Sequence, residues 1–165
     1  MPDAPQRRSV LAGTTAGDLV KERTSLCIRR LYEDAPGLDL PREPNRSTVN
    51  DGLHALWLAP GEWLLVSESK DIEIDAMASD LSHGRTVFRI AAGPAREILA
   101  KGCPLDLREG EFQPGHCGQS VLCGVGVLVH HLEDGAHMDI YVARSYGRFI
   151  HDWLQDAALS LTRPE

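Results

Sequence analysis

The sequence has no excess of positive charge. Its 17 Lys and Arg residues are outnumbered by 24 Asp and Glu residues, which gives a formal net charge of -7, and the basic residues are scattered along the chain. Nucleic acids and anionic membrane surfaces bind proteins mainly through clustered positive charge. We therefore expect no nucleic-acid partner and no membrane partner.

Long apolar runs and export signals are also missing. The longest uncharged apolar stretch, 121–129, is far shorter than the ~20 residues needed to cross a bilayer. Arg7 and Arg8 begin like a twin-arginine signal, but Gly and Thr dominate 13–17 and charged residues follow from Asp18. A signal peptide needs an apolar segment at that place. These absences predict a cytoplasmic protein.

The four cysteines show no C-x-x-C spacing, and we interpret them as reduced thiols in the core rather than as two disulfides. His116, Cys117 and Cys123 could supply three zinc ligands, because the two cysteines would share one face of a continuous strand. Gly118 and the missing C-x-x-C weigh against that site. We therefore expect no stoichiometric metal ion.

No nucleotide-binding or catalytic motif occurs in the sequence: P-loop, G-x-S-x-G and H-E-x-x-H are all absent. Gly124 and Gly126 form a G-x-G, but the segment continues as a strand where a dinucleotide site would open a helix. His130 and His131 are adjacent on that strand, so they point to opposite faces. The motifs predict no catalytic, cofactor-binding or metal-binding residue in this chain.

Hairpins and helices alternate along the sequence. A Pro60-Gly61 turn between two apolar runs predicts a β-hairpin over 54–67, with Trp57 and Trp63 facing each other. The other predicted strands are 25–32, 85–91, 119–123, 125–132 and 138–142, the predicted helices are 71–81, 93–102 and 145–161, and 34–51 is mostly loop. This order predicts an α+β fold with largely antiparallel sheets and packed helices.

The first 24 residues have little periodicity, and we predict that 1–24 form an N-terminal arm that is ordered only against something else. The remainder, 25–165, is predicted to be a single domain, formed as one unit or as two small halves sharing a core. The interface candidates are apolar residues of the arm and of one edge of the last helix: Val10, Leu11, Leu19, Val20, Phe149 and Trp153. The edge of the helix, near Phe149 and Trp153, is assigned either to the core or to a partner. Deletion of 1–20 is then expected to leave the fold cooperative and to weaken partner binding.

Five segments have a distinctive sequence: 56–66 (LWLAPGEWLLV), 93–107 (GPAREILAKGCPLDL), 112–122 (FQPGHCGQSVL), 141–146 (YVARSY) and 153–158 (WLQDAA). In this order they closely resemble the gamma subunit of heterotetrameric sarcosine oxidase, from about residue 51 to 160. The segment Lys101–Leu107 carries the most specific part of the resemblance.

The resemblance implies a fold similar to the folate-binding domain of glycine-cleavage T-protein, and a non-catalytic role in the assembly or stabilisation of an oxidoreductase complex. The family's complex oxidises sarcosine to glycine in sarcosine catabolism, with tetrahydrofolate accepting the one-carbon unit and oxygen the electrons. Its alpha and beta subunits carry NAD, FAD, FMN and the folate site, and its delta subunit carries zinc. The implied partners are therefore the alpha, beta and delta subunits, and no cofactor is implied for this chain.

Two alternatives remain open. One is a freestanding T-protein-like folate-binding protein, because some such proteins share the Lys-Gly-Cys found here at 101–103; this chain then continues with Pro-Leu-Asp. The other is the equivalent subunit of a related complex that oxidises another N-methyl amino acid.

Overall fold

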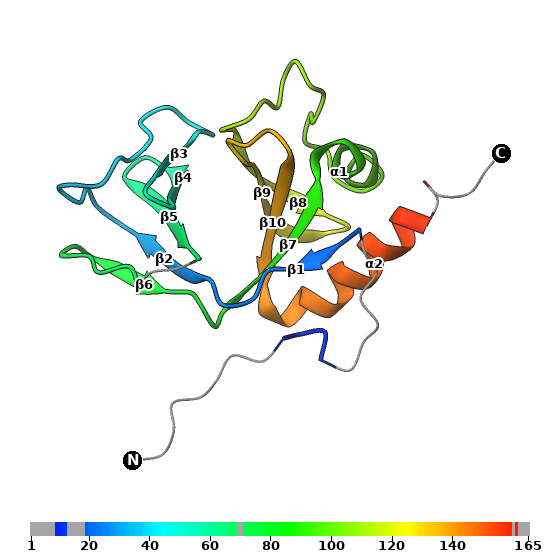
Figure 1. The fold of residues 1–165 in the computed structure, drawn as a ribbon, viewed down its shortest axis with the longest axis horizontal. Helices are drawn as coiled ribbons and strands as arrows, with labels where there is room; N and C mark the ends of the chain where they lie inside the picture. The colour runs from blue at the N-terminus through cyan, green and yellow to red at the C-terminus, as the bar shows by residue number, and fades with distance from the viewer. Residues whose placement is uncertain (1–8, 13–18, 69–70, 160, 162–165) are drawn as a thin grey trace, which may run out of the picture.

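The computed structural model describes residues 9–12, 19–68, 71–159 and 161. Within these residues the strands form two five-stranded sheets (Figure 1). Sheet A has the order β1 (Lys21–Glu22), β7 (Arg85–Ala91), β10 (His137–Ala143), β9 (Val125–His131) and β8 (Cys117–Leu122). Sheet B has the order β3 (Ser47–Asn50), β4 (Leu53–Ala59), β5 (Glu62–Ser67), β2 (Cys27–Leu31) and β6 (Ala78–Asp80).

Every strand pair in the two sheets is antiparallel. Two helices, α1 (Ala92–Leu99) and α2 (Gly147–Leu159), pack on sheet A, and a short 3-10 helix (Arg144–Tyr146) leads into α2. Figure 1 shows both helices on the side of sheet A that faces away from sheet B. The predicted α+β fold with largely antiparallel sheets is confirmed.

Three apolar layers follow from the two-residue alternation of side chains along the strands. The layer between sheet A and the helices contains Phe88, Ile90, Met138, Ile140, Ile98, Leu99, Ile150 and Leu154. The layer between the two sheets contains Leu26, Ile28, Leu56, Leu64, Val66, Val87, Cys117, Leu128 and Tyr141. The outer face of sheet B is covered by loops, whose Ala35, Leu40 and Ile72 pack against Leu31, Ala55, Trp63 and Leu65. Both sheets are therefore buried on both faces.

The hairpin over 54–67 is confirmed as β4 and β5, and Trp57 lies opposite Trp63 in its register. Gly61 adopts φ 76° in the connecting turn, a conformation that glycine allows without a Cβ clash. The G-x-G segment continues as a strand, as predicted, because Gly126 lies in β9, and Gly124 lies in the turn that joins β8 to β9.

The predicted helix over 71–81 is wrong. The residues 78–80 form β6, which pairs with β2 in sheet B, and Ile72, Ile74 and Ala76 pack against the outer face of that sheet. These three side chains alternate with Asp71, Glu73 and Asp75, a two-residue period that fits extended chain better than a helix. The predicted loop over 34–51 likewise includes a short strand, β3.

The N-terminal segment contributes to the core of the chain itself. Val20 is fully buried and Leu11 is 7% exposed, and Val10 and Leu19 pack against the same layer beneath the helices. β1 pairs with β7, and Arg23 donates its backbone N–H to the Val87 carbonyl at 2.8 Å. We expected these four apolar side chains to contact a partner, but Leu11 and Val20 are buried in the chain's own core and Val10 and Leu19 pack against it half-buried.

The rest of the predicted arm, 1–8 and 13–18, lies outside the described residues. The boundary at residue 24 stays a prediction. Among the described residues, no helix combines the length and the apolar character needed to span a membrane.

Candidate functional site

A cluster of polar side chains lies between the two sheets. His54 on β4 shares its face with Leu56, and His130 on β9 shares its face with Leu128, so both imidazoles point into the layer between the sheets. Glu133 follows β9, and Ser47 begins β3. We call Ser47, His54, His130 and Glu133 the inter-sheet cluster.

The carboxylate of Glu133 is the centre of this cluster. Its Oε1 accepts a hydrogen bond from Ser47 Oγ at 2.6 Å and lies 3.6 Å from His130 Nε2, and its Oε2 lies 3.2 Å from His54 Nδ1. His130 Nε2 also lies 2.9 Å from Ser47 Oγ, and the two imidazole centroids are 5.5 Å apart. Three side chains from both sheets therefore meet at the Glu133 carboxylate.

The charge state of Glu133 follows from these contacts. Burial raises the pKa of its carboxyl, but the contacts with His130, His54 and Ser47 outweigh burial and hold that pKa well below the usual range. His130 is 1% exposed, whereas the side chains of His54 and Glu133 are 21% and 26% exposed. The cluster thus holds an ionised carboxylate and two imidazoles in a largely buried site, where His54 Nδ1, His130 Nδ1 and Glu133 Oε2 are out of contact with solvent.

A second polar group between the sheets is a network of arginines and carboxylates. Arg89 on β7 donates two hydrogen bonds of 2.7 Å to Asp139 on β10, its direct cross-strand neighbour. Arg23 lies 3.5 Å from the same carboxylate and also pairs with Glu68, just after β5. This network joins the N-terminal segment and sheet A to sheet B.

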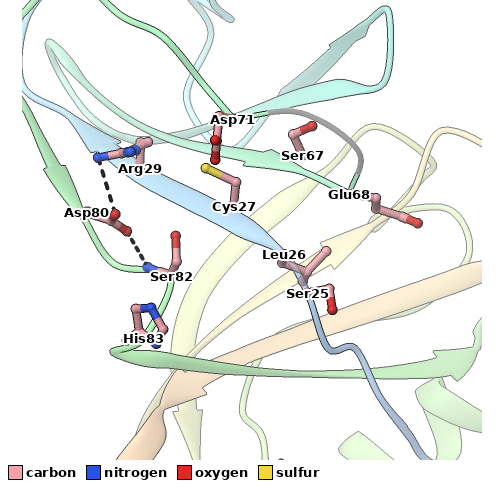
Figure 2. A pocket seen from close by; sticks show the side chains of 10 residues that line it. All are labelled: Ser25, Leu26, Cys27, Arg29, Ser67, Glu68, Asp71, Asp80, Ser82 and His83. Atoms are coloured by element: carbon pink, nitrogen blue, oxygen red, sulfur yellow. Dashed lines mark hydrogen bonds and ion pairs between the residues drawn. The ribbon is translucent and has the colours of Figure 1, made fainter. Parts of the chain in front are cut away.

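A groove of about 460 Å³ runs along β2 and β6 at the edge of sheet B (Figure 2). Arg29 lies 3.3 Å from Asp80, and the backbone N–H of Ser82 donates to the same carboxylate at 2.9 Å. Hydrogen bonds from Ser82, with the charge of Arg29, hold the pKa of Asp80 below its usual range. These charged groups pair across the groove, and residues 69–70 beside it lie outside the described residues.

The four cysteines are free thiols, but only Cys103 and Cys117 are buried, so the predicted core position is wrong for Cys27 and Cys123. Cys117 is fully buried and its Sγ lies 3.3 Å from the carbonyl oxygen of Arg46, and burial raises the pKa of its thiol to about 12. Cys123 is exposed in the β8–β9 turn, and Cys103 is buried beside Ser120. His116 Nδ1 lies 3.1 Å from the Glu111 carbonyl oxygen, and among the described residues it forms no metal-binding group with the two cysteines.

The start of α2 presents apolar side chains to solvent. Phe149 is 50% exposed and Tyr146, just before the helix, is 51% exposed. Trp153, one turn further along, packs instead against the core beneath the helices. Of the two interface candidates on this helix, Phe149 is therefore the one whose ring is open to a partner.

Sequence reasoning missed the inter-sheet cluster because its members come from separate segments. Ser47 and Glu133 are 86 residues apart, and no spacing rule connects them. His54 was the one indication in the sequence. It is a polar residue that shares a strand face with Leu56 and Leu58, and that face is otherwise apolar. His130 and His131 do point to opposite faces, because His131 Nδ1 lies 3.1 Å from the Phe112 carbonyl oxygen on the helix side.

Comparison with known proteins adds three matches. Residues 30–160 match the family described as "Sarcosine oxidase, gamma subunit family". The "Sarcosine oxidase subunit gamma" of Corynebacterium sp. (strain U-96) is 27% identical over 142 residues, which are 79% of this chain and 69% of that protein. A chain in the solved structure of the heterotetrameric sarcosine oxidase from Corynebacterium sp. U-96, in complex with pyrrole 2-carboxylate, has a TM-score of 0.75 at 24% identity. That match covers 93% of this chain and 91% of the other, and it shows a shared fold.

Proposed function

The chain belongs to the sarcosine oxidase gamma subunit family, and from this membership we propose that it is a non-catalytic subunit of a sarcosine oxidase complex. In this proposal the chain acts in assembly or stabilisation, and the complex demethylates sarcosine oxidatively to glycine. The observation that carries the proposal is the family match over 30–160, which spans β3 to β10 and both helices.

The use of the polar side chains supports a structural role. Asp139, Arg89, Arg23 and Glu68 form a network of ion pairs. It joins β7 and β10 to the N-terminal segment and to the residue that follows β5. Arg29 and Asp80 pair across the groove at the edge of sheet B. These charges therefore stabilise the fold, and they are not arranged around a reacting group.

The exposed apolar side chains support a partner surface. Phe149 and Tyr146 lie together at the start of α2, each about half exposed. Exposed aromatic side chains are frequent in the centre of protein interfaces. We place a contact with a larger subunit at this end of α2.

The partners follow from the same proposal. They are the alpha, beta and delta subunits, with FAD, FMN, NAD and the tetrahydrofolate site on the large subunits and zinc on delta. The chain would thus take part in one-carbon metabolism through its partners, in the cytoplasm. The similarity of its fold to the folate-binding domain of glycine-cleavage T-protein stays a prediction.

Omission of this chain from the complex tests the role. The alpha, beta and delta subunits are co-expressed with and without the chain, and soluble complex and sarcosine-dependent peroxide release are measured. We expect the yield of soluble complex to fall without the chain and the isolated chain to release no peroxide. Equal yield and activity without the chain would contradict the proposal. Saturable binding of tetrahydrofolate to the isolated chain in calorimetry would favour the freestanding folate-binding alternative.

A further inference from the structure

The inter-sheet cluster brings together side chains of the kinds that bind transition metals. We propose that His54, His130 and Glu133 form a binding site for one divalent transition-metal cation of the zinc type, located between the two sheets. The site goes beyond the proposed role in assembly, because it concerns what this chain itself binds.

The ligand set and its spacing fit a zinc ion. Two imidazoles and one carboxylate are a common protein ligand set for zinc. One ligand atom from each residue lies within 4.8 Å of the other two. Bonds of about 2.0–2.1 Å in tetrahedral geometry separate the ligand atoms by about 3.4 Å. His54 Nδ1 lies 3.2 Å from Glu133 Oε2 and His130 Nε2 lies 3.6 Å from Glu133 Oε1, both close to that value. The two separations end on different oxygens of Glu133, so both oxygens of the carboxylate face the site.

Unpaired buried atoms point to the same site. Among the described residues, His54 Nδ1, His130 Nδ1 and Glu133 Oε2 are each buried without a hydrogen-bond partner. His54 Nδ1 and Glu133 Oε2 are close enough to pair, but they do not form a hydrogen bond with each other. Buried polar atoms without partners cost free energy, and a bound ion is one way in which proteins satisfy them. A cation bonded to His54 Nδ1 and Glu133 Oε2 would satisfy two of the three.

Ser47 supplies the outer contact that metal sites usually have. Its hydroxyl donates to Glu133 Oε1 at 2.6 Å and fixes the plane of the carboxylate, which leaves Oε2 directed at His54. Outer-shell hydrogen bonds of this kind orient ligands and typically change metal affinity 10–100-fold. Because His54 belongs to sheet B and His130 to sheet A, a bound cation would also connect the two sheets.

Titration of the full-length chain with zinc tests the site. Protein freed of metal by a chelator is titrated with Zn²⁺ in a calorimeter, and bound Co²⁺ is examined by its visible absorption, which reports direct coordination. We expect one zinc per chain, a tetrahedral cobalt spectrum, and a higher midpoint of thermal unfolding with zinc. Glu133→Gln and His54→Gln should lose at least about 100-fold in affinity, more than the 10–100-fold expected for Ser47→Ala.

Two control variants separate this site from adventitious binding. His137→Ala removes a histidine from the exposed pair that His137 forms with Asp134, and Cys123→Ser removes the exposed thiol. Both should bind zinc like the original chain. His54→Gln keeps a polar side chain at a partly exposed position, so it remains informative if Glu133→Gln fails to fold. Absence of saturable zinc binding would overturn the proposal and leave the cluster as an ion-pair network. Binding that survives His54→Gln and Glu133→Gln, or is lost in a control variant, would overturn it as well.

Discussion

At the scale of single residues, Gly102 lies close against Trp153 of α2. It follows α1, and a Cβ placed on it would lie 2.8 Å from both Cys123 Sγ and Trp153 Cζ2. The indole of Trp153 is held against the core beneath the helices, so it has little freedom to move away. The glycine of the Lys-Gly-Cys segment at 101–103 is therefore explained by packing, because a larger residue at position 102 would clash with Trp153 and Cys123.

Gly102→Ala is expected to lower the free energy of unfolding by about 1–3 kcal/mol, because the added methyl group overpacks this contact. Chemical denaturation of the two proteins measures the difference. Gly93→Ala is the matched control, since Gly93 lies in α1 and a Cβ added to it would meet no other atom within 4 Å; it should be neutral or slightly stabilising. A loss of stability at residue 93 equal to that at residue 102 would show that the packing explanation is wrong.

Asp139 is the residue on which the buried arginine network depends. Its side chain is 5% exposed, and Arg89 and Arg23 are 22% and 15% exposed. Asp139→Asn leaves two largely buried guanidinium groups with only the more exposed carboxylate of Glu68 as a charged partner, so we expect a loss of about 3 kcal/mol. The exposed pair of Asp34 and Arg42 is the control, and Asp34→Asn should have no measurable effect in the same urea titration. Equal stability of Asp139→Asn and the original chain would refute a structural role for the network.

At the scale of elements, the N-terminal segment behaves as part of sheet A. Val20 and Leu11 are buried beneath the helices, and Val10 lies close to Gly147, the first residue of α2. Local periodicity could not reveal this, because each contact joins a short irregular segment to strands and helices that are distant in the sequence. The interface candidates of this segment were chosen because they are apolar, and in the structure these apolar side chains pack against the chain's own core.

Deletion of residues 1–20 is now expected to destabilise the chain, in contrast to the expectation from the sequence. It removes the buried side chains of Leu11 and Val20, and single large-to-small changes at such sites cost about 2–5 kcal/mol. Thermal unfolding followed by circular dichroism measures the change. A change of 1 kcal/mol in stability shifts the unfolding midpoint by roughly 2–8 °C. A midpoint within about 2 °C of that of the full chain would therefore show that the segment is a separate arm, as the sequence predicted.

The start of α2 is the element that we expect to contact a partner. Phe149→Ser removes an exposed ring, so the free energy of unfolding should change little, whereas co-purification with the large subunits should weaken. Met77→Ser is the control, because Met77 is 64% exposed in a segment next to sheet B, away from α2. Pull-down yields of the large subunits are measured for both variants and normalised to the original chain. We expect a lower yield for Phe149→Ser than for Met77→Ser. Equal yields for both variants would place the contact elsewhere.

At the scale of the whole molecule, the sequence predicts the local units well. The Pro60-Gly61 hairpin, the strand 85–91 and the helix that begins near Pro94 all depend on turn residues and periodicity within a few positions, and all three are present. The prediction for 71–81 was wrong because its apolar side chains fit both a helical period and a two-residue period. The pairing of β6 with β2 selects the extended conformation. Apart from the polar His54 on an apolar strand face, nothing in the sequence indicates the inter-sheet cluster, since Ser47, His54 and Glu133 meet only after the two sheets pack together.

Native mass spectrometry of the chain co-expressed with the alpha, beta and delta subunits tests most directly whether the chain is a subunit of the complex. We expect one assembly that contains this 18.1 kDa chain together with the large subunits. Collisional activation should release the chain from that assembly. A chain found only as a free species of 18.1 kDa, beside an assembly that is complete without it, would contradict the proposed role as a subunit.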